Sequence, residues 1–328
     1  MKNTTQSEFG VKVRGELRYQ EPMQRHTSWR AGGCAQRAYV PADLADLSQF
    51  LRSHPQDELI HVLGLGSNIL VRDGGLRGTV ILLHRALNNM RMTTGPDGEP
   101  ALYVQAGVAA PSVAQFAAKH HFDGAEFLAG IPGTIGGALA MNAGCYGAEI
   151  WDSVITVTTI DRDGMLHERS AHDYEIGYRA VQLRPSAIQG VGSATPDVRV
   201  STQFSTQQEW FVAAHFSFRT GEIDAAEQKI KELLHRRQAS QPLSQPNAGS
   251  VFRNPIGNHA ARLIDACGLP GLTIGDAQVS TKHANFIVNL GAATAFDIEA
   301  LIEKVQRVVK AQQGITLERE VRIVGELA

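Results

Sequence analysis

Short apolar runs separated by turns predict a series of strands. The runs Leu59–Leu63, Val80–Leu83 and Leu102–Ala106 each have the length of a single strand. Val154–Ile160 predicts a further strand. In Trp210–Phe218 apolar residues alternate with more polar ones, which is typical of an antiparallel strand with one buried face.

Two segments with apolar residues at helical spacing predict long helices. The first runs from about Glu222 to Arg237 and the second from about Ala295 to Gln313. Thr294 is placed to cap the second helix, and Gly314 is placed to end it. The closing segment Leu317–Ile323 predicts a last strand.

Composition and charge exclude several classes of protein. The chain has 328 residues, of which 43% are hydrophobic and 20% charged, as in a soluble globular protein of two or three domains. The formal net charge of −2 leaves no basic excess to neutralise a phosphate backbone. We therefore expect no nucleic-acid partner, and nothing in the pattern points to an obligate protein partner.

The sequence also favours a cytoplasmic location. The three cysteines, Cys34, Cys145 and Cys267, form no CxxC pair and are odd in number, so neither a zinc site nor a disulfide framework is expected. The first ten residues lack the apolar segment of a secretory signal. The uncharged stretch 127–148 could span a bilayer by length, but its six glycines favour turns over a membrane helix.

Two proline- or polar-rich segments predict breaks between elements. Gln241-Pro242 and Gln245-Pro246 end the first long helix and indicate a domain hinge. Arg184–Gln207 is rich in Ser, Thr, Gly, Gln and Pro, which predicts a long surface loop. For this segment we favour an insertion without a functional role over a lid that covers a binding site.

Two glycine-rich regions are the first candidates for ligand binding. Gly64–Asn68 follows a predicted strand, where backbone N–H groups could approach a phosphate, but a plain tight turn explains it equally well. Ile69 stands where a Rossmann fingerprint needs its third glycine, so that fold is not predicted. Gly130–Gly137 and Asn142–Gly147 favour a planar or phosphate-bearing ligand against the backbone over a strand with bulges.

Two further segments carry polar residues that, taken alone, do not indicate a functional site. In Asn247–Pro255, Ser250 alone would be interpreted as a turn residue. On a strand over Leu317–Ile323, Glu318, Glu320 and Arg322 would share one face, which alone is typical of surface ion pairs.

Taken in order, these segments resemble the UDP-N-acetylenolpyruvoylglucosamine reductase family. The resemblance covers nearly the whole chain, and its specificity lies in the ordered set of motifs. These motifs are His26–Gly33, Gly64–Asn68, Glu126–Gly137, Asn142–Gly147, Gly177–Arg179, Ala248–Phe252, Ile274–Ser280, Lys282–Ala284 and Leu317–Gly325.

The resemblance implies an α+β flavoprotein of three domains, with the FAD-binding fold of the vanillyl-alcohol-oxidase type and a C-terminal substrate domain. The expected division is 1–84 and 85–222 for the FAD-binding subdomains and 223–328 for the UDP-sugar domain. NADPH would reduce non-covalently bound FAD. The flavin would then pass a hydride to UDP-N-acetylglucosamine enolpyruvate to give UDP-N-acetylmuramate, in peptidoglycan precursor synthesis.

The resemblance also implies roles for individual residues. Arg179 and Glu320 would stabilise the negative charge that follows hydride transfer, and Ser250 would donate the proton. The expected cofactor-binding residues are Gly64, Gly66, Ser67, Asn68, Gly130, Pro132, Gly133, Thr134, Gly136, Gly137, Asn142 and Gly144. The expected substrate-binding residues are Tyr146, Tyr178, Arg253, Gln278, His283 and Arg322. No metal site is expected.

Some positions differ from the usual family pattern. Ala180 stands where a serine commonly follows the Tyr-Arg pair, and Gly257–Ala260 lacks an aromatic pair often found there. Arg184–Gln207 is longer than usual and contains no tyrosine, so it does not resemble the tyrosine-bearing closing loop of one family type. Glu126 and Gly133–Gly137 resemble the family type without that extra closing loop. A flavin oxidase of the same fold is the alternative, and a non-catalytic flavin or UDP-sugar binder is another. The joint presence of Arg179, Ser250 and Glu320 favours the reductase.

Overall fold

The computed structural model describes residues 13–187 and 209–328. Its α-helices are α1 (Leu44–Ser53), α2 (Ala110–Lys119), α3 (Ile135–Ala140), α4 (Ile223–Ser240), α5 (Ala260–Ala266) and α6 (Ala295–Gln313). Its strands are β1 (Glu16–Pro22), β2 (Cys34–Val40), β3 (Ile60–Leu63), β4 (Ile69–Val71), β5 (Leu76–Leu82), β6 (Met90–Thr94), β7 (Pro100–Gln105), β8 (Phe122–Asp123), β9 (Gly144–Cys145), β10 (Ala148–Glu149), β11 (Val154–Asp161), β12 (Leu166–Arg169), β13 (Tyr174–Gly177), β14 (Ala180–Leu183), β15 (Glu209–Phe216), β16 (Arg219–Thr220), β17 (Thr273–Ile274), β18 (Ala277–Val279), β19 (Ile287–Asn289) and β20 (Arg322–Val324).

The chain divides into two units. The first comprises Met1–Glu16, Val40–Asp57 and Leu83–Ile230, and the second comprises Leu17–Tyr39, Glu58–Leu82 and Lys231–Ala328. The division falls inside α4, ten residues before the end of that helix at Ser240. The second unit is therefore assembled from both ends of the chain.

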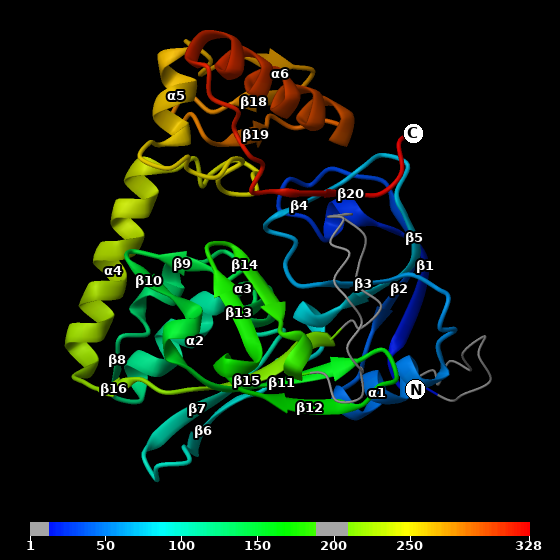
Figure 1. Ribbon diagram of the computed structural model, residues 1–328, viewed down its shortest axis with the longest axis vertical. Coiled ribbons are helices and arrows are strands. Elements are labelled where there is room, and N and C mark those ends of the chain that lie inside the picture. Colours follow the sequence, from blue (N-terminus) through cyan, green and yellow to red (C-terminus); the bar gives the residue numbers. More distant parts are fainter. Residues whose placement is uncertain (1–12, 188–208) are drawn as a thin grey trace. The chain divides into compact units, whose positions relative to one another are not determined.

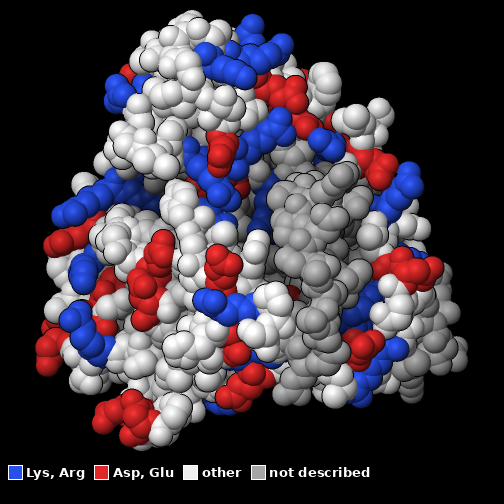
Figure 2. All heavy atoms as spheres, in the orientation of Figure 1, with Lys and Arg blue, Asp and Glu red and all other residues white. Residues whose placement is uncertain are grey.

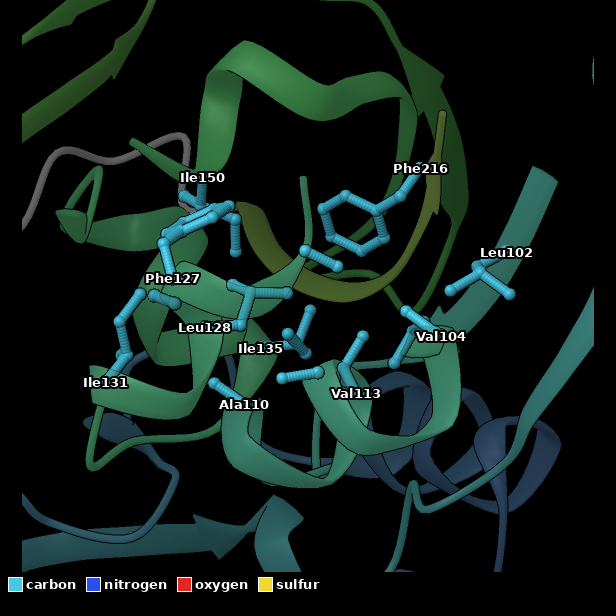
Figure 3. Close-up of a cluster of buried hydrophobic side chains, with 14 of the residues drawn as sticks. Leu102, Val104, Ala110, Val113, Phe127, Leu128, Ile131, Ile135, Ile150 and Phe216 are labelled. Atoms are coloured by element: carbon cyan, nitrogen blue, oxygen red, sulfur yellow. The ribbon is translucent and has the colours of Figure 1, made fainter. Parts of the chain in front are cut away.

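The first unit is built around a five-stranded antiparallel sheet of order β12-β11-β15-β7-β6 (Figure 1). Helix α3 packs against β15, and α2 packs against the short 3-10 helix Glu126–Gly130. Apolar side chains from these elements form one core, which Figure 3 shows around Leu128 and Ile135. The hairpins β9–β10 and β13–β14 also belong to this unit.

The second unit contains a four-stranded sheet of order β1-β2-β5-β3, in which β2 and β3 both run parallel to β5. It also holds the antiparallel sheet β17-β18-β19 and the parallel pair β20–β4. Its core joins α5 and α6 to Trp29, which is 0% exposed. The indole N–H of Trp29 donates to the carbonyl of Ile287 at 2.8 Å, so the N-terminal segment is tied to β19.

The two predicted long helices are confirmed as α4 and α6. Thr294 caps α6: its hydroxyl accepts from the Asp297 N–H at 3.1 Å, while the Asp297 carboxylate accepts from the Thr294 N–H at 3.0 Å. Gly314 follows with φ of 71° and ends the helix. Asp73 adds a second cap from outside the helix, since its carboxylate accepts from the N–H groups of Ala295 and Phe296.

The predicted alternation in Trp210–Phe218 is only partly correct. β15 ends at Phe216, and Val212, Ala213 and Ala214 are all buried. Ala213 points to the opposite face of the sheet from Val212 and Ala214, so residues on both faces of β15 are buried at this point.

The predicted strand over Leu317–Ile323 is wrong for most of its length. Only Arg322–Val324 forms a strand, β20, which pairs with β4. Upstream, the N–H groups of Glu320 and Val321 both donate to the carbonyl of Val251, at 2.8 and 3.4 Å. This convergence bends the chain, so strand alternation does not place Glu320 and Arg322 on a common face.

The predicted surface loop Arg184–Gln207 lies mostly outside the described residues. Its first residues, Pro185–Ala187, form a 3-10 turn.

Candidate active site

Two of the three predicted catalytic residues, Ser250 and Glu320, are brought together within the second unit. The carbonyl of Val251, the residue after Ser250, accepts the Glu320 N–H at 2.8 Å. The N–H of Arg253 donates to the carbonyl of Glu318 at 2.9 Å. The backbone thus places the neighbours of Ser250 directly against the segment that carries Glu320.

Asn68, a predicted cofactor-binding residue, joins the same network. Its side-chain amide donates to the carbonyl of Glu320 at 3.1 Å, and its own carbonyl accepts the Arg322 N–H at 3.1 Å. The turn Gly64–Asn68, which follows β3, is therefore attached to the C-terminal segment. Three sequence regions that contain predicted site residues meet here.

Two predicted substrate-binding arginines interact in this network. The Arg322 side chain reaches the surface. Partial desolvation by the surrounding protein, and then the positive charge of Arg253, lower the pKa of Arg322 below its usual value. Two guanidinium groups that repel each other in the protein are well suited to an anion, since an anion relieves the repulsion and accepts paired hydrogen bonds.

Asn285 is a residue of this network that the sequence analysis missed. Its backbone carbonyl accepts the Val251 N–H at 2.9 Å. Its side chain accepts the Phe252 N–H at 3.0 Å and donates to the Phe252 carbonyl at 2.8 Å. The available signal was a polar residue between the motif Lys282–Ala284 and an apolar strand.

Gln278 and His283 belong to the same unit. Gln278 is the middle residue of β18 and pairs with Val288 of β19. His283 precedes β19 and its ring contacts Phe286 edge-on, with centroids 4.7 Å apart. Burial lowers the pKa of His283 below its usual value, which favours a neutral imidazole.

Arg179, the third predicted catalytic residue, lies in the first unit. Tyr178 and Arg179 form the turn between β13 and β14, and the Arg179 guanidinium carbon lies 5.6 Å from the centroid of the Tyr178 ring. The side chain of Asn142 donates to the Gly177 carbonyl at 3.2 Å, just before this turn. Asn142 thus attaches the hairpin that carries Arg179 to the second glycine-rich region.

Several predicted site residues have a backbone conformation that favours glycine. Among the described residues, six non-glycine residues have positive φ, and Asn142 (39°), Tyr146 (57°) and Arg179 (55°) are three of them. Such strain costs about 1–3 kcal/mol per residue and is concentrated at functional sites. The local backbone is therefore consistent with a site at these two turns.

The glycines of the second region have a packing role that the sequence analysis did not foresee. A Cβ on Gly136 would lie 2.8 Å from the Cβ of Ala106, and the Gly136 N–H donates to the Ala106 carbonyl. A Cβ on Gly130 would lie 2.5 Å from the sulfur of Cys145. The Thr134 hydroxyl caps α3 by accepting the Gly137 N–H at 3.5 Å. Contacts within the protein, without a ligand, thus explain several of these residues.

The first region has a similar close approach. Gly66 has φ of +61°, and a Cβ there would lie 2.0 Å from the carbonyl oxygen of His26. A hollow of about 420 Å³ adjoins this segment and is lined by Gln24, Arg25, Thr27 and Arg30. Two of these residues are arginines, a residue type that suits an anionic group of a ligand.

One buried polar atom of the first unit points to a missing donor. Asn142 Oδ1 is buried and accepts no hydrogen bond from the described residues, while its Nδ2 donates to Glu149 at 2.6 Å. A buried acceptor of this kind normally has a hydrogen-bond partner, which can be a ligand. A flavin ring with its N–H group is such a partner, so the residues present fit FAD.

Comparison with known proteins identifies the family. A model of the FAD binding domain family matches residues 35–170, and one of the UDP-N-acetylenolpyruvoylglucosamine reductase C-terminal domain matches residues 241–324. The UDP-N-acetylenolpyruvoylglucosamine reductase of Thiobacillus denitrificans is 53% identical over 323 residues, which cover 96% of this chain and 94% of the relative. The chain belongs to the UDP-N-acetylenolpyruvoylglucosamine reductase family.

Other members of the reductase family agree. The relative from Nitrosospira multiformis is 55% identical, over 95% of this chain and 90% of its own. The crystal structure of the Thermus caldophilus reductase matches with a TM-score of 0.72 at 29% identity, over 95% of this chain and 99% of that one. These matches confirm the predicted family, the flavoprotein fold, the FAD cofactor and the oxidoreductase class. They do not support the alternatives of a flavin oxidase or a non-catalytic binder.

The surface of the reductase carries charges of both signs. Figure 2 shows basic and acidic side chains interspersed over the described part of the face in view. Within residues 13–187 and 209–328, none of the helices is long and apolar enough to cross a membrane.

Proposed function

We propose that Arg179, Ser250 and Glu320 carry out the reaction of this reductase. The reaction reduces the enolpyruvyl group of UDP-N-acetylglucosamine enolpyruvate to give UDP-N-acetylmuramate in peptidoglycan precursor synthesis, with NADPH as co-substrate. Bound FAD supplies the hydride transfer, from NADPH to the terminal vinyl carbon. The double bond gains that hydride and one proton, and NADPH becomes NADP⁺.

Ser250 is the proposed source of the proton. Hydride addition at the terminal carbon leaves the electron pair on the α-carbon, next to the carboxylate, and a proton must be delivered there. The observation that carries this assignment is the hydrogen bond from the Glu320 N–H to the Val251 carbonyl, which puts a hydroxyl and a carboxyl on adjoining backbone segments. Serine is a weak acid, but the developing carbanion is strongly basic.

Arg179 and Glu320 are proposed to stabilise the charge that develops on the substrate carboxylate. A guanidinium group can donate two parallel hydrogen bonds to a carboxylate. The strained φ of Arg179 supports a constrained position for this side chain.

The remaining predicted residues are proposed to bind the ligands. Arg253 and Arg322 suit the anionic groups of the UDP-sugar. Further substrate contacts are assigned to Tyr146, Tyr178, Gln278 and His283. FAD would be held without a covalent bond by Gly64, Gly66, Ser67, Asn68, Gly130, Pro132, Gly133, Thr134, Gly136, Gly137, Asn142 and Gly144.

The organisation of the enzyme is part of the proposal. We propose subdomains 1–84 and 85–222 for FAD and 223–328 for the UDP-sugar. The enzyme would work in the cytoplasm on its two small molecules, with no obligate protein partner.

The variant Ser250→Ala tests the assignment of the proton donor. Anaerobic reduction of the flavin by NADPH should survive, because that step needs no proton from Ser250. Reoxidation by the enolpyruvyl substrate should slow by about 10²–10⁴-fold, the usual contribution of a general acid. Stopped-flow absorbance of the flavin measures both steps. Equal slowing of the two would show that Ser250 only shapes the pocket.

A further inference from the structure

Ser250 lies in a segment that is not held by a regular strand. Around it, the described backbone makes only isolated bridges, at Asn247 and at Phe252. Gly249, directly before it, has φ of +75° and open space at its Cβ position. The position of the Ser250 hydroxyl therefore depends on what holds the residues that follow.

Asn285 holds both of the residues that follow. Its backbone carbonyl binds the N–H of Val251, and its side-chain amide binds both the N–H and the carbonyl of Phe252. The amide thus acts as a substitute for a neighbouring strand.

The surroundings of this amide allow one arrangement. Asn285 is 4% exposed and Phe252 is 1% exposed, so water does not replace the two side-chain bonds. The Phe252 N–H requires an acceptor and its carbonyl a donor, which fixes the amide orientation. The carbonyl of Val251, whose N–H is bound by Asn285, accepts the Glu320 N–H.

We propose that Asn285 is a positioning residue for proton transfer, which sets the place of Ser250 and, through Val251, of Glu320. This inference rests on the proposed role of Ser250 as proton donor. In this role Asn285 acts only through the backbone of Val251 and Phe252.

The variant Asn285→Asp isolates this role. It keeps an oxygen to accept the Phe252 N–H and replaces the donor to the Phe252 carbonyl by a second oxygen. The chain offers a matched control in Asn289, which is 3% exposed. Its amide donates to the Trp29 carbonyl at 2.9 Å, and its oxygen accepts from Gly291 and Ala293. Asn289→Asp makes the same chemical change away from Ser250.

Both variants are measured as FAD-loaded proteins by the two anaerobic half-reactions. Asn285→Asp should slow reoxidation by the enolpyruvyl substrate about 10–100-fold, since small misplacements of a catalytic group have effects of this size. Flavin reduction by NADPH should change less than about threefold. Asn289→Asp should leave both rates within that margin. In a Ser250→Ala background, Asn285→Asp should add almost nothing, because the donor it positions is gone.

The outcomes separate the inference from the function on which it rests. The positioning role is refuted, and the proton donor stands, if Ser250→Ala slows reoxidation but Asn285→Asp does not. The same conclusion follows if both variants slow reoxidation and their effects add in the double variant. Equal effects of the two asparagine variants would also refute it. Normal reoxidation by Ser250→Ala would refute both. Should Asn285→Asp not bind FAD, Asn285→Ser is judged by the same criteria.

Discussion

Replacement of Gly66 by alanine should damage the turn between β3 and β4 far more than its small size suggests. The new Cβ would lie 2.0 Å from the carbonyl oxygen of His26 and 2.9 Å from the Cα of Thr27. Both are backbone atoms, so no side chain can rotate away. The turn itself must move.

The expected cost has two parts. A left-handed φ costs a non-glycine residue about 1 kcal/mol. The Gly66 carbonyl accepts from the N–H and the hydroxyl of Ser28, at 3.1 and 3.3 Å. If the turn withdraws, these two hydrogen bonds are lost at about 1 kcal/mol each, for a total of about 3 kcal/mol.

Gly314→Ala is the matched control. Gly314 lies in the same unit with φ of +71°, and no atom lies within 4 Å of its Cβ position. Its replacement should cost only the conformational part, about 1 kcal/mol. Urea unfolding of the FAD-free proteins gives both free energies of unfolding, and titration with FAD gives the affinities. Gly66→Ala should also weaken FAD binding, whereas Gly314→Ala should not.

Equal destabilisation by the two alanines would refute this reasoning. It would mean that the approach of Gly66 to His26 contributes nothing beyond its φ. Unchanged FAD affinity of Gly66→Ala would separately count against a cofactor role of this turn.

Two further variants test other parts of the second unit. If Glu320 acts as a hydrogen-bond donor to the developing charge, Glu320→Gln should retain more of the single-turnover reoxidation rate than Glu320→Asp, and the reverse order would show that the negative charge itself is needed. Glu299 accepts two hydrogen bonds from Arg72, both 2.8 Å, which hold the pKa of Glu299 below its ordinary value of 4.5. The pair therefore stabilises the fold above about pH 4.5, and this contribution is lost as the pH falls through the lowered pKa. Glu299→Gln should flatten the fall of the unfolding free energy as the pH drops below about 4.5, and an unchanged slope would exclude the pair as its cause.

Features set by neighbouring residues could be predicted from the sequence. The limits of α6 follow from the Thr294 cap and from Gly314, both of which act within one turn of the helix. The turn Gly64–Asn68 also follows strand β3 directly, as its glycines and the preceding apolar run predict.

Features set by distant residues could not be predicted from the pattern. The alternating charges of Leu317–Ile323 suggested a strand, but the carbonyl of Val251, far away in sequence, bends this segment. The role of Asn285 depends equally on two backbone groups of Phe252 that no local pattern announces. The family resemblance named Ser250 and Glu320, and only the fold shows which groups hold Glu320 and the two residues after Ser250.

The contact between Trp29 and Ile287 has a consequence for biosynthesis. The two residues are separated by 258 positions, and the core that Trp29 enters is formed mainly by residues beyond 247. At about 5–20 residues per second, a ribosome needs about 10–50 s to reach Ile287 after Trp29. Throughout that time most of the core that Trp29 and Leu70 enter has not been synthesised, because the stretch Leu83–Ile230 is made before the residues that complete that core. The nascent chain must therefore keep apolar residues of its first segment out of wrong contacts until its last segment emerges.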